Sequence, residues 1–235
     1  MLKKLLPALI GATLAIGAFA DEASVKRNFE TKFGAKAESV TKSGYLGLYE
    51  IYADGQILYS DEKGSAYIVG PLIDGKTMKN VTQERMVRLT SIKWSDLPLE
   101  RAVKQVRGDG KRVLASFEDP NCGYCKRLAK ELQKLDNVTI YTFLYPILSQ
   151  DSVDKSKQIW CADDRAKAWN DWMVEGRALT GRSDCDTTAI ARNQEFGRKL
   201  NINGTPTLFF ADGERIPGAV PMAKIEQKLA QTAGK

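Results

Sequence analysis

The chain has 235 residues, 43% of them hydrophobic and 27% charged, with a formal net charge of +6 at pH 7. This length can bury more than one hydrophobic core, so we expect two domains. The positive charge is mild and scattered, which argues against nucleic-acid binding. Because the sequence contains no histidine, histidine-based metal sites and histidine acid–base catalysis are excluded.

The first 20 residues have the three parts of a secretory signal peptide. Lys3 and Lys4 precede an apolar stretch from Leu5 through Ala18, and Ala18-Phe19-Ala20 provides an A-x-A cleavage site. We expect residues 1–20 to be removed on export to an oxidising compartment in which disulfides persist. A retained membrane anchor is the weaker alternative, because the stretch is short and a proline interrupts it.

Residues 21–81 are expected to form a small α+β domain. Val25, Phe29 and Phe33 recur at helical spacing and predict an amphipathic helix that ends at Gly34. Three strand-like segments follow, at 45–52, 56–60 and 66–69. One helix on a small sheet gives a modest core, so we expect a dimer, with the apolar side chains of 45–52 as the preferred interface.

Residues 82–107 are expected to form a helical linker. Met86, Leu89 and Trp94 stand among charges, which is typical of a partly exposed connecting helix. Pro98 is typical of an early helix position, so a second helix is predicted over 99–106.

Cys122-Gly123-Tyr124-Cys125 is the most informative motif. It follows an apolar, strand-like run at 113–117 and precedes a helical pattern, so Cys122 is expected at a helix N-terminus, where the backbone N–H groups and the helix dipole stabilise a thiolate. Because the thiolate is the nucleophile of disulfide exchange, the motif predicts a redox-active dithiol. A zinc site and an inert disulfide are weaker alternatives, since Cys161 and Cys185 lack C-x-x-C spacing.

Residues 108–235 alternate strand and helix. A strand at 113–117, a helix at 122–135 and a strand at 138–144 predict a βαβ unit. Further elements are predicted as helices at 155–172, 187–200 and 222–231 and a strand at 207–210. An α/β layer fold with a cysteine pair at the first strand-to-helix junction is the expected thioredoxin architecture, here with a helical insertion. In an exported chain the second pair, Cys161 and Cys185, predicts a structural disulfide.

Gly204-Thr205-Pro206 directly precedes the predicted strand at 207–210. It resembles the motif of thioredoxin-like proteins in which the proline is cis and lies beside the dithiol. Such a turn would direct the backbone N–H and C=O of Thr205 outward, where they can pair with an extended substrate strand. Pro206, Gly123 and Tyr124 are expected to contact substrate as well.

Together these motifs make the chain resemble the DsbC family of periplasmic disulfide isomerases. The resemblance rests on the C-G-Y-C motif, on Ile159-Trp160-Cys161-Ala162, on Gly204-Thr205-Pro206 and on the small upstream domain. It implies a V-shaped homodimer joined through cystatin-like N-terminal domains, with two thioredoxin domains facing a peptide-binding cleft. It also implies that Cys122 attacks wrong disulfides in exported proteins, that Cys125 resolves the intermediate, and that a membrane reductase of the DsbD type supplies electrons. No metal or other cofactor is expected.

Departures from the family pattern concern proton transfer. Lys126 stands where members often have histidine, and Ser116 stands six residues before Cys122, where many thioredoxin relatives have a buried carboxylate. The proton of Cys125 must then pass to water or to another group. Glu118 and Asp119 are weak candidates, because they are expected to be surface turn residues.

Three competing functions remain open at this point. A DsbA-like thiol oxidase would share the dithiol and the proline but would not need an N-terminal dimerisation domain. A DsbG-like reductase of sulfenylated cysteines is closer in architecture. A redox-independent periplasmic chaperone that binds unfolded chains belongs to a different class, because it would work without the cysteines.

Overall fold

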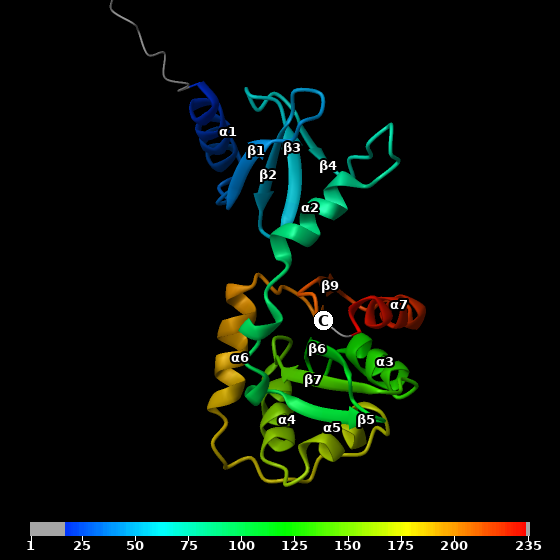
Figure 1. Cartoon of the computed structure of the whole chain (residues 1–235). Helices are drawn as coiled ribbons and strands as arrows, with labels where there is room; N and C mark the ends of the chain where they lie inside the picture. The colour runs from blue at the N-terminus through cyan, green and yellow to red at the C-terminus, as the bar shows by residue number, and fades with distance from the viewer. Residues whose placement is uncertain (1–16, 234–235) are drawn as a thin grey trace, which may run out of the picture. The chain divides into compact units, whose positions relative to one another are not determined.

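A computed structural model describes residues 17–233 (Figure 1). Residues 1–16 of the expected signal peptide lie outside the described part, and residues 17–20 belong to the first helix. The chain separates into two compact units, one up to Gln83 and one from Glu84 on. Within 17–233, no helix is both long and apolar enough to cross a membrane.

The first unit is one helix and a four-stranded antiparallel sheet. Its elements are α1 (Gly17–Phe33), β1 (Ser39–Lys42), β2 (Tyr49–Ala53), β3 (Gln56–Ser60) and β4 (Tyr67–Val69), and the strands lie in the order β1-β2-β3-β4. Val25 and Phe29 of α1 pack with Ile51 of β2 in one buried cluster. The sequence did not predict β1, which pairs with β2 from Ser39↔Tyr52 to Lys42↔Tyr49.

The expectation that 45–52 forms a dimer interface stays a prediction, and it can apply only to the part before β2, where Leu46 is 92% exposed. All five residues of β2 are buried within the unit, so both faces of the strand are already covered. The strand also begins later than predicted, at Tyr49, because Gly44, Leu46 and Gly47 adopt positive φ and turn the chain.

The helical linker expected over 82–107 is shorter than predicted. Only α2 (Val81–Thr90) is α-helical, and two short 3-10 turns follow, η1 (Trp94–Asp96) and η2 (Leu99–Arg101). The helix predicted over 99–106 is wrong, because residues 103–107 form a strand, β5 (Val103–Arg107). Along β5 buried and exposed side chains alternate, and this period of two suits a strand in a sheet.

The second unit is built on a five-stranded sheet. Its other strands are β6 (Arg112–Glu118), β7 (Val138–Leu144), β8 (Thr207–Phe210) and β9 (Arg215–Pro217), in the order β5-β7-β6-β8-β9. β6 and β7 are parallel, and α3 (Gly123–Leu132) connects them as predicted. Every other strand pair in this sheet is antiparallel.

Four further helices complete this unit: α4 (Gln150–Trp160), α5 (Arg165–Met173), α6 (Thr188–Lys199) and α7 (Met222–Thr232). The single helix predicted over 155–172 is two helices. The break has a local cause, because Asp164 caps α5 by accepting a hydrogen bond from the backbone N–H of Lys167.

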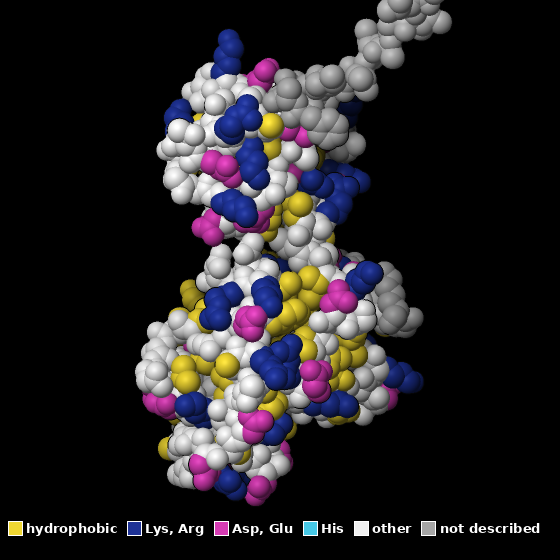
Figure 2. Space-filling view, turned by 90° about the vertical axis from the view of Figure 1, so that its left-hand side faces the viewer, with side chains coloured by type: hydrophobic (Ala, Val, Ile, Leu, Met, Phe, Trp, Pro, Cys, Tyr) yellow, Lys and Arg dark blue, Asp and Glu magenta, His cyan; other side chains and the backbone are white. Residues whose placement is uncertain are grey.

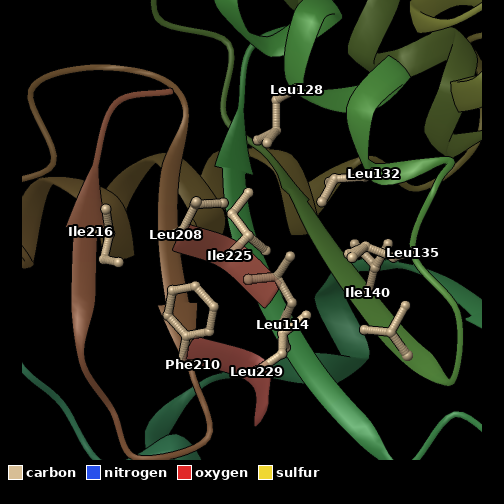
Figure 3. Close-up of a cluster of buried hydrophobic side chains, with 11 residues drawn as sticks. Leu114, Leu128, Leu132, Leu135, Ile140, Leu208, Phe210, Ile216, Ile225 and Leu229 are labelled. Atoms are coloured by element: carbon tan, nitrogen blue, oxygen red, sulfur yellow. The ribbon is translucent and has the colours of Figure 1, made fainter. Parts of the chain in front are cut away.

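Buried side chains cover both faces of this sheet. On one face, leucine, isoleucine, valine and phenylalanine side chains from β6, β7, β8, β9, α3 and α7 form a continuous cluster (Figure 3). On the other face Ala115 and Phe117 of β6 pack with Phe143, Phe209 and, from α6, Phe196. Residues of β6 therefore point alternately towards α3 and towards α6, which determines the environment of every side chain near the end of the strand.

Charged groups of both signs are intermixed on one face of the molecule. On the face that Figure 2 displays, Lys and Arg side chains lie among Asp and Glu side chains and between small hydrophobic areas. No large field of one sign dominates this face.

The segment after α2 is attached to the second unit at Gly213. The backbone N–H of Ile92 donates to the Gly213 carbonyl oxygen at 3.1 Å, and a Cβ on Gly213 would lie 1.7 Å from the Ile92 oxygen. Gly213 also has a φ of +81°. A side chain at this position therefore costs both conformational strain and a steric clash with backbone.

We expect Gly213→Ala to destabilise the second unit by more than the roughly 1–2 kcal/mol that a left-handed alanine costs by itself. Gly176→Ala is the matched control, because Gly176 has a φ of +69° and no atom within 4 Å of the added Cβ. Denaturant unfolding of both variants measures the difference. Equal destabilisation would contradict the close approach of Ile92.

Candidate active site

The chain reverses direction between β6 and α3, and this turn places the first cysteine at a helix N-cap. The backbone N–H of Cys122 donates to the Asp119 carbonyl oxygen at 3.0 Å, and the N–H of Lys126 donates to the Cys122 carbonyl oxygen at 3.0 Å. Cys122 has extended dihedral angles, and α3 begins at the next residue. Its side chain therefore lies at the helix end where backbone N–H groups are free of intrahelical partners.

Both thiols of the motif are free, and they differ in burial. Cys122 is 7% exposed, whereas Cys125, on the first turn of α3, is fully buried. Gly123 and Tyr124, between them, are exposed, with Tyr124 60% accessible. Only Cys122 is thus accessible to a substrate disulfide.

The fold brings the second predicted motif to the dithiol. The Thr205–Pro206 peptide bond is cis, and Cys122 Sγ lies 3.3 Å from the Thr205 carbonyl oxygen although 83 residues separate them in sequence. Thr205 is partly exposed and Pro206 is buried. Cys122, Thr205 and Pro206 therefore form one site.

The environment of Cys122 favours its thiolate. The pKa of Cys122 is lowered from 9.0 to about 5, chiefly by the hydrogen bond with the Cys125 thiol. Thr205 and the backbone N–H groups of Tyr124 and Cys125 lower this pKa further, while partial burial opposes them. At neutral pH Cys122 is therefore ionised and is a competent nucleophile.

The environment of Cys125 favours its neutral thiol. Burial is the main cause that raises the pKa of Cys125 well above its ordinary value, and the hydrogen bond to Cys122 and the charge of Glu118 act in the same direction. The two thiols are thus held in opposite protonation states. This asymmetry suits one attacking and one resolving cysteine.

Glu118 and Asp119 are not surface turn residues, and that expectation is wrong. Glu118 is 1% exposed and Asp119 is fully buried. Sequence patterns underestimated the burial of these two residues because β6 remains buried up to its last residue, so the turn begins inside the protein. Asp119 before Pro120 and Asn121 is, however, typical of an Asx turn, a local signal that could have located it.

Asp119 fastens the dithiol turn to the loop that follows β7. Its Oδ1 accepts from the Asn121 N–H at 2.8 Å. Its Oδ2 accepts from the N–H groups of Ile147 and Leu148, at 2.8 and 3.0 Å. Because one carboxylate accepts hydrogen bonds from both segments, it fixes the position of the loop beside Cys122.

The lysine that follows the dithiol contacts an aromatic ring. The ammonium group of Lys126 lies 4.0 Å from the centroid of the Trp172 ring, and Trp172 Nε1 donates to the Pro120 carbonyl oxygen at 2.7 Å. The hydrogen bond attaches α5 to the dithiol turn, and the cation–π contact attaches α5 to α3. Sequence patterns did not indicate a site role for Trp172, because a tryptophan in a helical pattern usually belongs to the core.

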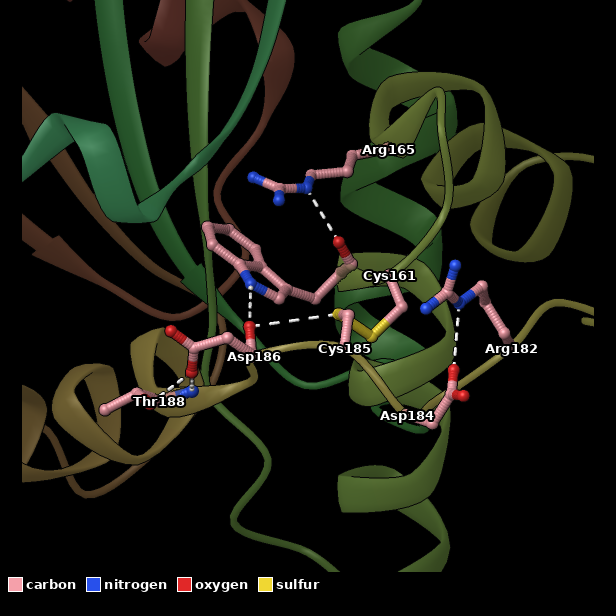
Figure 4. Close-up of a disulfide and its surroundings, with 8 residues drawn as sticks. Cys161, Arg165, Arg182, Asp184, Cys185, Asp186 and Thr188 are labelled. Atoms are coloured by element: carbon pink, nitrogen blue, oxygen red, sulfur yellow. Dashed lines mark hydrogen bonds and ion pairs between the residues drawn. A yellow bond between two sulfur atoms is a disulfide. The ribbon is translucent and has the colours of Figure 1, made fainter.

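The remaining two cysteines, Cys161 and Cys185, are joined in a disulfide, the pairing that was expected (Figure 4). It links the end of α4 to the segment that precedes α6, and beside it Trp160 Nε1 donates to the Asp186 carbonyl oxygen at 3.1 Å. A zinc site built from all four cysteines is incompatible with this bond.

Known proteins with a similar sequence include proteins of thiol-disulfide exchange. Residues 17–83 match the family described as the disulfide bond isomerase protein N-terminal domain, and residues 99–233 match the thioredoxin-like domain family. A probable thiol:disulfide interchange protein DsbC from Bordetella parapertussis is 47% identical over 207 residues, covering 88% of this chain and 73% of that protein. The chain belongs to the DsbC family.

More distant relatives and a solved structure support this membership. The thiol:disulfide interchange protein DsbC of Escherichia coli K12 is 28% identical over 226 residues, which cover 92% of each chain. A disulfide interchange protein from Neisseria gonorrhoeae aligns with a TM-score of 0.56 and 40% identity, covering 59% of this chain and all of that chain. The chain is therefore a thiol-disulfide oxidoreductase with a DsbC-type N-terminal domain and a thioredoxin-like domain.

We expect the alkylation rate of reduced protein by iodoacetamide to rise with pH and to reach half of its plateau near the Cys122 pKa of about 5. The rate falls as the pH drops below this value because the thiolate is protonated. In Cys125→Ala, which removes the main hydrogen bond, the midpoint should move to higher pH. A midpoint between about 8 and 9 in the unaltered protein, the range of a free cysteine, would contradict the assigned environment.

Proposed function

We propose that the protein is an exported disulfide isomerase and reductase that acts through Cys122 and Cys125. The Cys122 thiolate attacks one sulfur of a wrong disulfide in a substrate protein. A bond forms between Cys122 and that sulfur, the substrate S–S bond breaks, and the other substrate sulfur leaves as a thiolate. The observation that supports this proposal most directly is the geometry of the pair: Cys122 lies at the α3 N-cap, 3.3 Å from the Thr205 carbonyl oxygen, and Cys125 is buried one turn later.

The mixed disulfide can be resolved in two ways. In the first, another thiolate of the substrate attacks the substrate sulfur that is bonded to Cys122. A new substrate disulfide forms, Cys122 leaves as a thiolate, and no net electrons are transferred. If Cys125 attacks Cys122, the substrate leaves reduced and the enzyme keeps a Cys122–Cys125 disulfide. The second route consumes two electrons from the dithiol, so an external donor must restore them, and we propose a membrane reductase of the DsbD type.

Substrate recognition is proposed to combine backbone pairing with apolar contact. The Thr205 backbone lies next to Cys122 and can pair with an extended segment around the attacked cysteine. Exposed apolar side chains of Tyr124, Ile147 and Leu148 stand on the two segments that Asp119 joins. Such a surface suits unfolded or misoxidised chains, which expose apolar residues.

A homodimer is proposed to form through the edge of the N-terminal sheet. β4 pairs with β3 on one side only, and its residues Ile68 and Val69 are exposed. An unprotected edge strand with apolar side chains is a template for pairing with a second copy. This edge replaces β2, whose residues are buried, as the preferred interface.

Location in the periplasm is proposed from the N-terminal residues 1–20, which have the composition of a secretory signal peptide. A thiol oxidase, a reductase of sulfenylated cysteines and a redox-independent chaperone remain the competing roles. Replacing both Cys122 and Cys125 by serine separates the chaperone from the others, because chaperone activity should survive this change.

We expect catalytic amounts of the mature chain to reactivate a scrambled, fully oxidised multi-disulfide protein in a glutathione buffer. Cys122→Ser should abolish this activity, because the attacking thiolate is lost. Cys125→Ser should retain part of it, since the substrate's own thiols can resolve the intermediate. Failure of the intact protein, despite a reducible Cys122–Cys125 pair, would contradict isomerase function and favour an oxidase or a sulfenic-acid reductase.

A further inference from the structure

Glu118 carries a buried carboxyl group that no structural interaction fully explains. Its Oε1 accepts a hydrogen bond from the Ser116 hydroxyl at 2.5 Å. Its Oε2 is buried and has no hydrogen-bond partner among residues 17–233. A buried carboxyl oxygen without a partner destabilises the fold, so the position calls for a role beyond stability.

The strand geometry places this carboxyl below the dithiol. Residues of β6 alternate between the two faces of the sheet, so Glu118 points to the same side as Leu114, the side that α3 covers. Leu144 of β7 is the register partner of Glu118. Leu144 packs in one buried cluster with Cys122 and Cys125, so the carboxyl lies beside that cluster.

We propose that Glu118 accepts the proton of Cys125 when the mixed disulfide is resolved, and that it thereby determines how often the enzyme acts as a reductase instead of an isomerase. This proposal rests on the function assigned above, because it concerns the second of the two routes out of the mixed disulfide.

The proposed step balances in protons and electrons. The Cys125 proton passes to the Glu118 carboxylate, directly or through one water molecule. The Cys125 thiolate then attacks Cys122 Sγ, a Cys122–Cys125 bond forms, and the bond from Cys122 to the substrate sulfur breaks. The substrate leaves as a thiolate with both electrons of the broken bond and takes the proton from Glu118. The enzyme is oxidised by two electrons and the substrate is reduced.

The electrostatic surroundings of Glu118 suit this cycle. Burial raises the pKa of Glu118 to about 8, the Ser116 hydroxyl lowers it, and the Cys122 charge raises it. The groups that act on Glu118 are thus Ser116 on its own strand and Cys122 and Cys125 at the start of α3, while Leu144 on β7 is apolar. In the mixed disulfide Cys122 carries no charge, so its contribution to the raised pKa of Glu118 is lost and a larger fraction of the carboxyl is ionised and can act as the base.

The test separates attack from resolution in single-turnover kinetics. Fully reduced protein is mixed with one equivalent of dithiobis-nitrobenzoate, a chromogenic aromatic disulfide. Release of the first nitrothiobenzoate reports attack by Cys122, and release of the second reports attack by Cys125 on the mixed disulfide. We expect Glu118→Gln to lower the ratio of second to first rate by about 100-fold, the low end of what a general base supplies.

Two controls make the result specific. Glu131→Gln removes an exposed carboxylate at the far end of α3, where it pairs with Lys134, and should leave both rates unchanged. The second rate of the unaltered protein should level off with rising pH once Glu118 is ionised, whereas that of Glu118→Gln should keep rising with hydroxide. Glu118→Ala repeats the measurement in case the glutamine variant does not fold.

The proposal would be overturned if Glu118→Gln or Glu118→Ala kept both the rate ratio and the pH profile of the unaltered protein. Absence of the first release in the unaltered protein would instead overturn the role of Cys122 as nucleophile, so the two failures are distinguishable. The proposal also requires Glu118→Gln to reactivate scrambled protein with less accumulation of fully reduced substrate.

Discussion

The position of the two sulfur atoms on the first turn of α3 is the constraint on which the rest of the active site depends. One sulfur is at the N-cap, next to free backbone N–H groups, and the other is one turn later on the buried side of the helix. The hydrogen bond between them is the largest single cause of the lowered Cys122 pKa. Burial and the same hydrogen bond raise the pKa of Cys125. A single geometric arrangement therefore makes the Cys122 thiolate reactive and keeps Cys125 protonated.

The surrounding fold holds this arrangement from three directions. The carboxylate of Asp119 fixes the turn against the loop after β7, and the hydrogen bond from Trp172 to the Pro120 carbonyl oxygen attaches α5 to the turn. The Thr205 backbone reaches Cys122 from the start of β8. Each of these supports comes from a different part of the chain. The site is therefore a product of the sheet order β5-β7-β6-β8-β9, in which β6 and β8 are neighbours, rather than of the C-x-x-C motif alone.

Local patterns predicted the parts of the site that depend on short-range chemistry. The helix after Cys122, the parallel β6–β7 unit and the motif ending in Pro206 were all identified in this way, because spacing and turn residues carry that information. Local patterns gave wrong predictions where tertiary contacts determine the secondary structure or the burial of a residue. Residues 103–107 form a strand because they pair with β7, which no local pattern indicates. Glu118 and Asp119 were predicted at the surface because their burial depends on elements that are distant in sequence. Trp172 was missed for the same reason.

The opposite protonation states of the two thiols can be measured through the pH dependence of the reduction potential of the Cys122–Cys125 pair, in a variant that lacks the Glu118 carboxyl. In Glu118→Gln no carboxyl next to the pair can change its protonation, so reduction of this variant takes up two electrons and one proton if Cys122 is a thiolate and Cys125 a thiol at neutral pH. The potential should then fall by about 30 mV per pH unit between about pH 6 and 7, and by about 59 mV per unit below the Cys122 pKa of about 5. A slope of about 59 mV per unit that continues through pH 7 would mean that both thiols are protonated in the reduced enzyme, and it would contradict the account.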